Sequence, residues 1–513
     1  MKRKVSLFLV LVMLFSLCSC SDTGNKARFT VGVLDEIKTF NPYKAQGDSE
    51  KIISANCFEG LLRFNATGHI DPAGATGYSV SSDMLTYTFS LNPDAQWYIS
   101  ENAKAYTDKI EDFKNTITAD DYIFALSLLK ENYKNDIKII KSITSPDDYT
   151  LKITLKVADR DFINTLASLP FYPCNKDFYK ITGENFATSP DTIITNGIYY
   201  IDNISDTGSV SLKGNSNYNG NCKLLNKEIH LYPTGKEDAL LTRFGNGDYD
   251  IFISENLQPD LGRGVTDPLY TTEIWGLSFN LKNNISKNVA FRKSIVSAID
   301  FSKLRTPSFV TEKAGGIIPG NYTLDCEAYS SFENSLTFPE YSEENALNFY
   351  NNALSQLKEN TLSIKIAIPT ELKESFIEIC TDLQRIFGKR LTVELIYFDV
   401  SEAEKIAKEG KYHIAVLPIK PKKATVKAIL DEISSAPCFF KDKKLNELLP
   451  VNSPQTEKTA KSFMEAEKYI IKNVIFIPLF NAGTVLYISD YVTGIYATNN
   501  GETIYFHSGE RIK

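Results

Sequence analysis

The chain has 513 residues, which is too long for one hydrophobic core, so two or three domains are expected. It is 43% hydrophobic and 23% charged, values that exclude a collagen-like or extensively disordered chain. The net charge of −7 at pH 7 argues against binding to DNA or RNA phosphates, so no nucleic acid partner is expected.

The first 20 residues, MKRKVSLFLVLVMLFSLCSC, predict a secretory signal. A basic start is followed by an apolar run from Val5 to Leu17, which is too short to span a bilayer. The run ends in Leu17-Cys18-Ser19-Cys20, which resembles a bacterial lipobox with Cys20 as the lipidated residue. A plain signal peptide cut elsewhere, or Cys18 as the anchor, are the alternatives. We therefore expect a lipid-anchored protein on the outer side of the bacterial cell membrane, at the cell surface or in the periplasm.

Residues 21–28 read as a polar tether, and the globular chain begins near residue 29. The six cysteines beyond the lipobox are scattered without a CxxC pair, so the spacing of a zinc site is absent and no metal is expected. An extracytoplasmic setting would permit disulfides. We favour buried free thiols, and the sequence alone cannot pair the cysteines.

The first half of the chain is rich in predicted strands. Residues 27–34 alternate apolar and polar side chains, and residues 60–91 read as strands separated by turns. Residues 118–133 have apolar side chains at helical spacing, with an acidic first turn. Residues 147–156 alternate again and predict another strand.

The second half alternates helices and strands. Helices are predicted at 287–300, 342–357, 370–388 and 453–473, and strands at 362–369, 390–398 and 474–480. Residues 341–418 therefore follow the order helix, strand, helix, strand, helix, strand, which is typical of a parallel sheet covered by helices. The contrast between the halves predicts two lobes.

One stretch of the second half, KYHIAVLPIKPKKATV at 411–426, combines a short buried strand with a basic end. Ile414 to Leu417 form an apolar run, and several lysines follow Pro418. Because proline cannot donate to a sheet ladder, the strand is expected to stop at Pro418.

No sequence pattern of a common enzyme site is present. The chain has no phosphate-binding glycine loop, no HExxH zinc motif and no GxSxG nucleophile elbow. His413 has no serine or cysteine marked as its nucleophile, so a structural histidine is the better interpretation. We expect neither an enzyme nor a cofactor.

Several stretches resemble, in order, the extracellular solute-binding proteins of family 5, the oligopeptide- and dipeptide-binding lipoproteins of ABC transporters. The resemblance covers nearly the whole mature chain, and no single match is decisive. The matching stretches are FNPYKAQGDSEKIISANCFEGLLRF, HIDPAGATGYSVSSDMLTYTFSLNPDAQW, TADDYIFAL, ITNGIYYI with GNSNYNG, FGNGDYDI, LSFNLKNNISKNVAFRKSIVSAID, AGGIIPG and EKYIIKNVIFIPLF. The chain departs from the family in a polar insertion of about twenty residues between Trp97 and Thr118, in Asn196, and in the missing arginine of SLKGNSNY.

The resemblance implies an α/β, two-lobed periplasmic-binding-protein-like fold of type II, in the peptide-binding cluster, with an extra subdomain in lobe I. Residues 29–58, 181–273 and 486–513 would form the core of lobe I, and residues 59–180 the extra subdomain. Residues 274–485 would form lobe II. The two crossovers between lobes would fall near Glu273–Gly276 and Phe480–Leu486, and the lobes would close over the ligand like a hinged trap.

The resemblance also implies which segments line the cleft. The first is Gln46-Gly47-Asp48, and the second runs from Thr271 to Gly276, with Glu273 and Trp275. The third is the basic stretch, with Pro418, Ile419, Lys420 and Lys422.

In peptide-binding members of the family, the third segment carries an aspartate that pairs with the α-ammonium of the peptide. Here the aligned residues run from Pro418 to Lys422, and a lysine stands near the place of that carboxylate. We therefore expect that no peptide amine is anchored at Lys422. Either the ligand presents an anion there, or its amine lies on Asp48 or Glu273. A solvated loop that never touches the ligand is the other possibility.

The function implied is the substrate-binding lipoprotein of an ABC importer, which captures a peptide or a related small ligand and delivers it to membrane permease subunits. The expected partners are the ligand, the permease subunits and, through the lipid anchor, the membrane, and the expected state is a monomer. The alternative is a surface lipoprotein that senses a signal peptide and is not coupled to transport.

Overall fold

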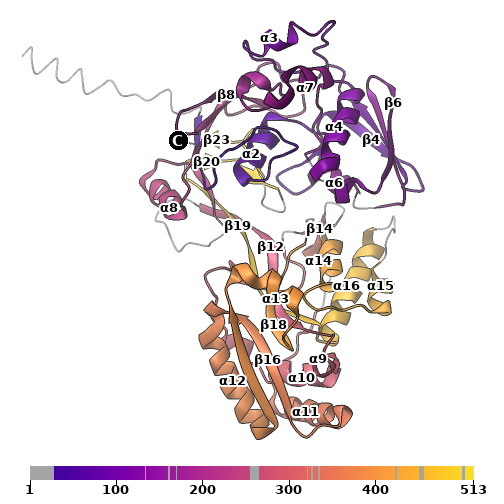
Figure 1. The fold of residues 1–513 in the computed structure, drawn as a ribbon, viewed down its shortest axis with the longest axis vertical. Coiled ribbons are helices and arrows are strands. Elements are labelled where there is room, and N and C mark those ends of the chain that lie inside the picture. The colour runs from indigo at the N-terminus through magenta and orange to yellow at the C-terminus, as the bar shows by residue number, and fades with distance from the viewer. Residues whose placement is uncertain are drawn as a thin grey trace, which may run out of the picture.

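The computed structural model describes residues 28–132, 134–159, 162–168, 170–254, 265–320, 322–324, 327–332, 336–421, 425–449, 456–498 and 503–512. The lipobox with Cys20 and the loop residue Lys422 lie outside these ranges. Figure 1 shows two lobes, one above the other, joined by long strands. We call the upper one, which holds both ends of the described chain, lobe I, and the lower one lobe II. No helix in the described ranges is both long enough and apolar enough to cross a bilayer.

One sheet runs through both lobes. Within the described residues its strands follow the order β17-β16-β18-β12-β19-β11-β1-β10-β9-β8, and β13 (Glu312–Lys313) pairs with the edge of β19. Strands β12 (Val265–Phe279) and β19 (Phe476–Ile488) are the longest and pair antiparallel with each other. They contact β11 on the lobe I side and β18 on the lobe II side. Both predicted crossovers lie in these two strands.

The lobe I sheet is built around β1 (Arg28–Val33), in which Phe29, Val31 and Val33 are buried as the alternation predicted. β1 runs parallel to β10 and β11, and β9 and β8 continue the sheet antiparallel. The bounds of these strands are β8 Tyr199–Ile204, β9 Val210–Gly214, β10 Glu228–Pro233 and β11 Ile251–Ser254. Helix α8 (Glu237–Asn246) contacts β1 and β11, and helix α2 (Asp48–Cys57) contacts β8.

A second sheet in lobe I stands apart from the first, at the right of Figure 1. Its order is β4-β5-β7-β6, and helix α4 (Ala119–Asn132) contacts β6. The strands are β4 Ala75–Val80, β5 Thr86–Leu91, β6 Ile140–Asp147 and β7 Thr150–Leu155. Tyr87, Phe89, Leu151 and Ile153 form the buried face of this sheet.

Lobe II has the helix-covered parallel sheet that the sequence predicted. β16 (Leu362–Pro369) runs parallel to β17 (Leu391–Phe398) and to β18 (Ile414–Ile419). The predicted helices are confirmed as α10 Val289–Ser297, α11 Glu343–Leu357, α12 Lys373–Phe387 and α16 Thr456–Lys472. Gly388 ends α12 with a positive φ of 61°. The shorter helices are α13 Ala403–Glu409, α14 Val426–Ile433 and α15 Lys443–Leu448.

The prediction that the third-segment strand stops at Pro418 is wrong. β18 continues to Ile419, and Pro418 is the cross-strand partner of Trp275 in β12. The pairing between β16 and β18 extends only to Ala415. One edge of β18 is therefore unpaired at Pro418, and the missing N–H of proline breaks no ladder there.

Five of the six downstream cysteines lie in the described ranges, and all five are free thiols. Cys57, Cys174 and Cys438 are buried, and burial raises the pKa of each thiol. Cys222 and Cys380 are half-buried. This agrees with the interpretation of free thiols for these five, and Cys326 lies outside the described residues.

Candidate ligand-binding site between the lobes

The ribbon of β12 and β19 is irregular where the lobes meet. The register shifts between Thr271 and Glu273, and again between Trp275 and Gly276. Gly483 pairs with Thr271, and a Cβ atom at Gly483 would lie 2.0 Å from the backbone oxygen of Tyr270. Only glycine allows this approach of the two backbones. Bulges of this kind bend and twist a strand pair locally, which suits a joint between two bodies.

A cavity of about 430 Å³ opens on one face of this ribbon. It lies within the size range of small-ligand sites, which is about 300–1,000 Å³. Three elements of lobe II and the two long strands surround it. Its lining consists of Thr272, Glu273, Trp275, Phe309, Val400, Ser401, Ala403, Glu404, Lys420, Ala482, Gly483 and Thr484.

Glu273 is the best-connected charged residue of the cavity. One oxygen of its carboxylate forms an ion pair with Lys420 Nζ, and Oε2 accepts a hydrogen bond from Trp275 Nε1 at 3.1 Å. The side chain of Glu273 is 24% exposed and that of Lys420 is 56% exposed. The pair is therefore partly desolvated on the glutamate side and open to solvent on the lysine side.

Trp275 forms part of the cavity wall without being exposed to bulk solvent. Its exposed fraction is 1%, and its ring meets that of Phe309 edge-on, with centroids 4.8 Å apart. The hydrogen bond to Glu273 satisfies the indole N–H, which burial would otherwise leave without a partner. Trp275 thus fixes the direction of the Glu273 carboxylate.

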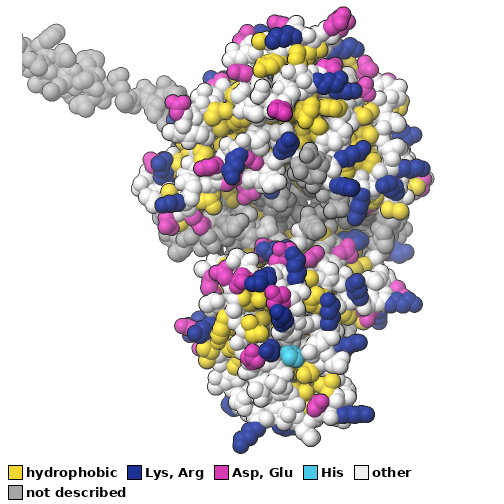
Figure 2. Space-filling model, in the orientation of Figure 1, with side chains coloured by type: hydrophobic (Ala, Val, Ile, Leu, Met, Phe, Trp, Pro, Cys, Tyr) yellow, Lys and Arg dark blue, Asp and Glu magenta, His cyan; other side chains and the backbone are white. Residues whose placement is uncertain are grey.

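The connection from β17 to α13 closes the cavity from the side. Asp399 caps the turn that follows it, because its Oδ1 accepts hydrogen bonds from the N–H and the hydroxyl of Ser401, at 2.9 and 2.6 Å. Glu404 Oε1 lies 3.4 Å from Lys408 Nζ on the exposed face of α13. Acidic and basic side chains also alternate along the rim of lobe II that faces lobe I (Figure 2).

The structure therefore brings the second and third predicted segments together. Pro418 is half-buried, and Ile419 is fully buried in the hydrophobic core of lobe II. Lys420 is the residue of the third segment whose side chain lines the cavity. Lys422 lies outside the described residues.

The first predicted segment lies elsewhere, at the N-terminus of α2 in lobe I, and does not line this cavity. The backbone N–H groups of Gln46 and Gly47 donate to Glu50 Oε2 at 3.0 and 3.3 Å. The other oxygen of Glu50 accepts from the N–H groups of Lys38 and Thr39. These two backbone donors of the segment are therefore engaged within the protein, while the side chains of Gln46 and Asp48 are exposed.

Gly47 has a structural reason to be glycine. The carboxylate of Asp35 packs against it, and a Cβ atom at Gly47 would lie 2.1 Å from Asp35 Oδ2. Asp35 Oδ1 in turn accepts from the Ser49 hydroxyl at 2.5 Å and so fixes the start of α2.

Sequence reasoning missed Phe309, Val400, Ser401, Glu404 and the stretch from Ala482 to Thr484. These residues come from three places in the chain, and only the fold brings them together. The one usable sequence signal for this part of the lining was Gly483, in the NAGT stretch of a predicted crossover. Glycine inside a strand marks a bulge or a close approach of two backbones.

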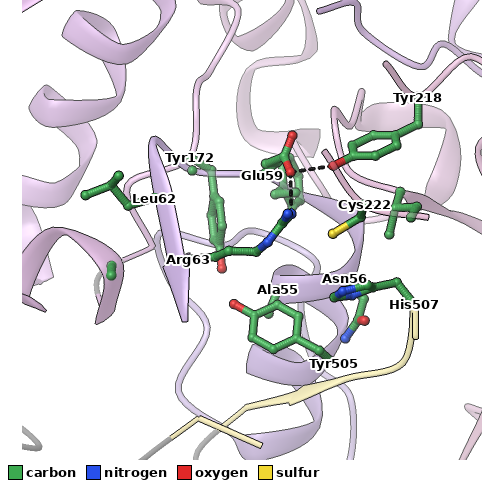
Figure 3. A pocket seen from close by; sticks show the side chains of 14 residues that line it. Ala55, Asn56, Glu59, Leu62, Arg63, Tyr172, Tyr218, Cys222, Tyr505 and His507 are labelled. Atoms are coloured by element: carbon green, nitrogen blue, oxygen red, sulfur yellow. Dashed lines mark hydrogen bonds and ion pairs between the residues drawn. The ribbon is translucent and has the colours of Figure 1, made fainter. Parts of the chain in front are cut away.

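A second, much smaller cavity of about 30 Å³ lies inside lobe I (Figure 3). Three of its polar side chains bond one another. Arg63 Nη1 donates to Glu59 Oε1 at 2.8 Å, and the Tyr218 hydroxyl donates to the same oxygen at 2.5 Å. Burial raises the pKa of Glu59, and Arg63 and Tyr218 oppose that shift. The cavity has room for about one ordered water, so it is a structural site.

Comparison with known proteins agrees with this architecture. The model of the bacterial extracellular solute-binding proteins, family 5, matches residues 69–344, more than half of the chain. The oligopeptide-binding protein AliA of Streptococcus pneumoniae is 29% identical over 216 residues, which is 39% of this chain and 33% of AliA. The periplasmic murein peptide-binding protein MppA of Escherichia coli is 26% identical over 282 residues, 52% of each protein. The match thus spans less than two thirds of either relative.

Solved structures match over a longer part of the chain. The unliganded open form of a murein tripeptide-binding protein MppA superposes with a TM-score of 0.75 at 19% identity, covering 95% of this chain and 98% of the other. OppA of Listeria monocytogenes bound to peptide gives a TM-score of 0.62 at 20% identity, covering 95% and 100%. The shared fold is the two-lobed periplasmic binding-protein fold. On the family match and this fold, the chain belongs to the bacterial extracellular solute-binding proteins of family 5.

Proposed function

We propose that the protein captures peptides, or closely related small ligands, between its two lobes and delivers them to the permease of an ABC importer. The observation that carries this proposal is the cavity on the bulged two-strand ribbon between the lobes. A joint of two strands can bend by small changes at a few residues while both lobes stay rigid. A ligand that contacts both lobes then favours the closed arrangement, because it binds that arrangement better.

The proposed ligand contacts come from both lobes. Glu273, Trp275 and Lys420 would act from the cavity, with Pro418 and the backbone of Ile419 beside them. Gln46 and Asp48 would approach from lobe I on closure, with Gly47 as the support of the loop. Lys422 is proposed as a further contact, on the sequence alone. An extended peptide bound through its backbone would suit such a site, because backbone hydrogen bonds are independent of the peptide's sequence.

Membrane attachment and domain boundaries remain part of the proposal. Lipid on Cys20 would hold the protein at the outer face of the membrane, with residues 21–28 as the tether. The lobe boundaries proposed from the sequence are supported by the two largest hydrophobic clusters of the described residues, one in each lobe. The protein would act as a monomer without a cofactor and without enzymatic activity.

The proposal is tested by identifying the ligand that the protein carries. The chain is purified from its host without a denaturing step, and native mass spectrometry measures the mass of any bound molecule before and after acid release. Released peptides, identified by fragmentation, are the expected result. Release of a single compound that is neither a peptide nor chemically related to one would contradict the proposal. If peptides are found, an unchanged peptide uptake in cells lacking the protein would contradict the transport step and favour a sensing role.

A further inference from the structure

The backbone register places Glu273 and Lys420 opposite each other. Ile274 pairs with Ile419 in the antiparallel ladder of β12 and β18, so the next positions outward are Glu273 and Lys420. Directly opposed residues of an antiparallel pair lie on the same face with their side chains in contact. The ion pair between them is therefore built into the strand pairing and does not depend on a chance loop conformation.

The charge of Glu273 is already compensated inside the protein. Lys420 Nζ contacts one carboxylate oxygen, and Trp275 Nε1 donates to the other at 3.1 Å. A ligand ammonium at this place would have to displace the lysine, which is tethered beside the carboxylate, and would lie close to a like charge. Glu404, the other acidic residue of the lining, has its own partner in Lys408.

Lys420 presents the remaining donors to the cavity. An ammonium group has three N–H donors and no acceptor, and the side chain is 56% exposed although one donor faces Glu273. A carbonyl or carboxylate oxygen of a ligand can accept from it, and a hydrogen bond from a charged donor is about twice as strong as a neutral one.

We propose that the Glu273–Lys420 pair makes this cavity select a ligand end that accepts hydrogen bonds and reject one that carries an ammonium group. This inference rests on the proposed capture of peptides and names the chemistry of one end of the site. A peptide with a blocked N-terminus fits this rule, and so does a peptide whose carboxylate lies at Lys420. Lys420 is then the residue that determines the specificity, and Trp275 positions Glu273.

The test compares two pools of random tetrapeptides that differ only in a free or an acetylated N-terminus. Calorimetry measures binding of each pool to the purified full-length chain, and native mass spectrometry counts the bound species. For the native chain we expect the acetylated pool to bind at least as tightly as the free pool. In Lys420→Gln the carboxylate of Glu273 loses its partner. The ratio of the affinities for the free and the acetylated pool should therefore rise by roughly tenfold, which corresponds to about 1.4 kcal/mol.

Two further variants test whether the charges of the Glu273–Lys420 pair determine the preference between the two pools. Glu273→Gln removes the carboxylate, so binding of the free-amine pool should not increase relative to binding of the acetylated pool. Lys405→Gln removes a lysine of the same helix whose partner, Glu402, does not line the cavity, and it should leave the ratio of the two pools unchanged.

The outcomes distinguish the two proposals. If only the free-amine pool binds the native chain, and Lys420→Gln leaves the ratio unchanged, the selectivity rule is overturned while peptide capture stands. If neither pool binds, peptide capture itself fails, and the rule derived from it fails as well.

Discussion

At the scale of single residues, we expect the buried His507 to contribute a loss of stability in acid. Burial, and then the charge of Arg63, lower the pKa of His507 to about 4, and the side chain is 7% exposed. In the unfolded chain an imidazole titrates near 6.5. The unfolded state therefore binds the proton first as pH falls, and the stabilisation present above about pH 6.5 is lost down to about pH 4.

The shift corresponds to about 3 kcal/mol of unfolding free energy across that window. We expect His507→Gln to remove this loss, so that the unfolding free energy of the variant, relative to that of the native chain, rises by up to about 3 kcal/mol as pH falls from about 6.5 to 4. Asp121 contributes in the opposite direction in both chains, so its effect cancels in this difference. Burial raises the pKa of Asp121 to about 7, so its stabilising contribution is lost as pH rises. Urea unfolding of the native and variant chains at several pH values measures the difference. Parallel pH profiles of the two chains would contradict the assignment to His507.

Individual residues also show which parts of the candidate site could not be predicted from the sequence. The resemblance led to Gln46, Gly47 and Asp48, but the backbone donors of the first two are used by Glu50 and the shape of the loop is set by Asp35. The role of Glu50 follows the three-residue spacing of a helix capping box from Gly47, whereas the role of Asp35, twelve residues before Gly47, does not follow from spacing. The ion pair of Glu273 depends on a strand register across 147 positions, which a sequence pattern does not specify.

At the scale of elements, the β12–β19 ribbon depends on Gly483. Gly483→Ala should push the two strands apart at Thr271, because its Cβ would lie 2.0 Å from the oxygen of Tyr270. Overpacking of this kind costs about 1–3 kcal/mol of unfolding free energy. Gly77→Ala in β4 is the matched control, since nothing lies within 4 Å of its added Cβ. Equal urea midpoints for the two variants would show that the close approach has no energetic consequence.

Elements whose pattern is local were predicted well. The helices of lobe II carry apolar stripes at helical spacing. Of the parallel strands, β16 and β17 alternate apolar and polar residues over much of their length, and β18 reads as a short apolar run, so both types of element were predictable from the sequence. The extent of β18 was not predictable in the same way. Whether Pro418 ends a strand depends on which edge of β18 is paired, and that is decided by β16 and β12.

At the scale of the whole molecule, the two lobes were predicted from the contrast between the two halves of the chain and from the family resemblance. The division into a strand-rich half and an alternating half follows from local patterns. The single sheet that passes through both lobes does not, because β12 and β19 are separated by about two hundred residues and form one ribbon only in the fold. The same separation explains why the cavity lining was only partly predicted.

Closure of the two lobes around a peptide is the central claim, and small-angle X-ray scattering measures it directly. The full-length chain is freed of bound ligand by partial unfolding and refolding, and its radius of gyration is compared before and after saturation with the peptides that bind it. We predict that the radius of gyration falls on binding, because the lobes rotate toward each other about the ribbon of β12 and β19. Tight binding of a peptide with an unchanged radius of gyration would contradict the account.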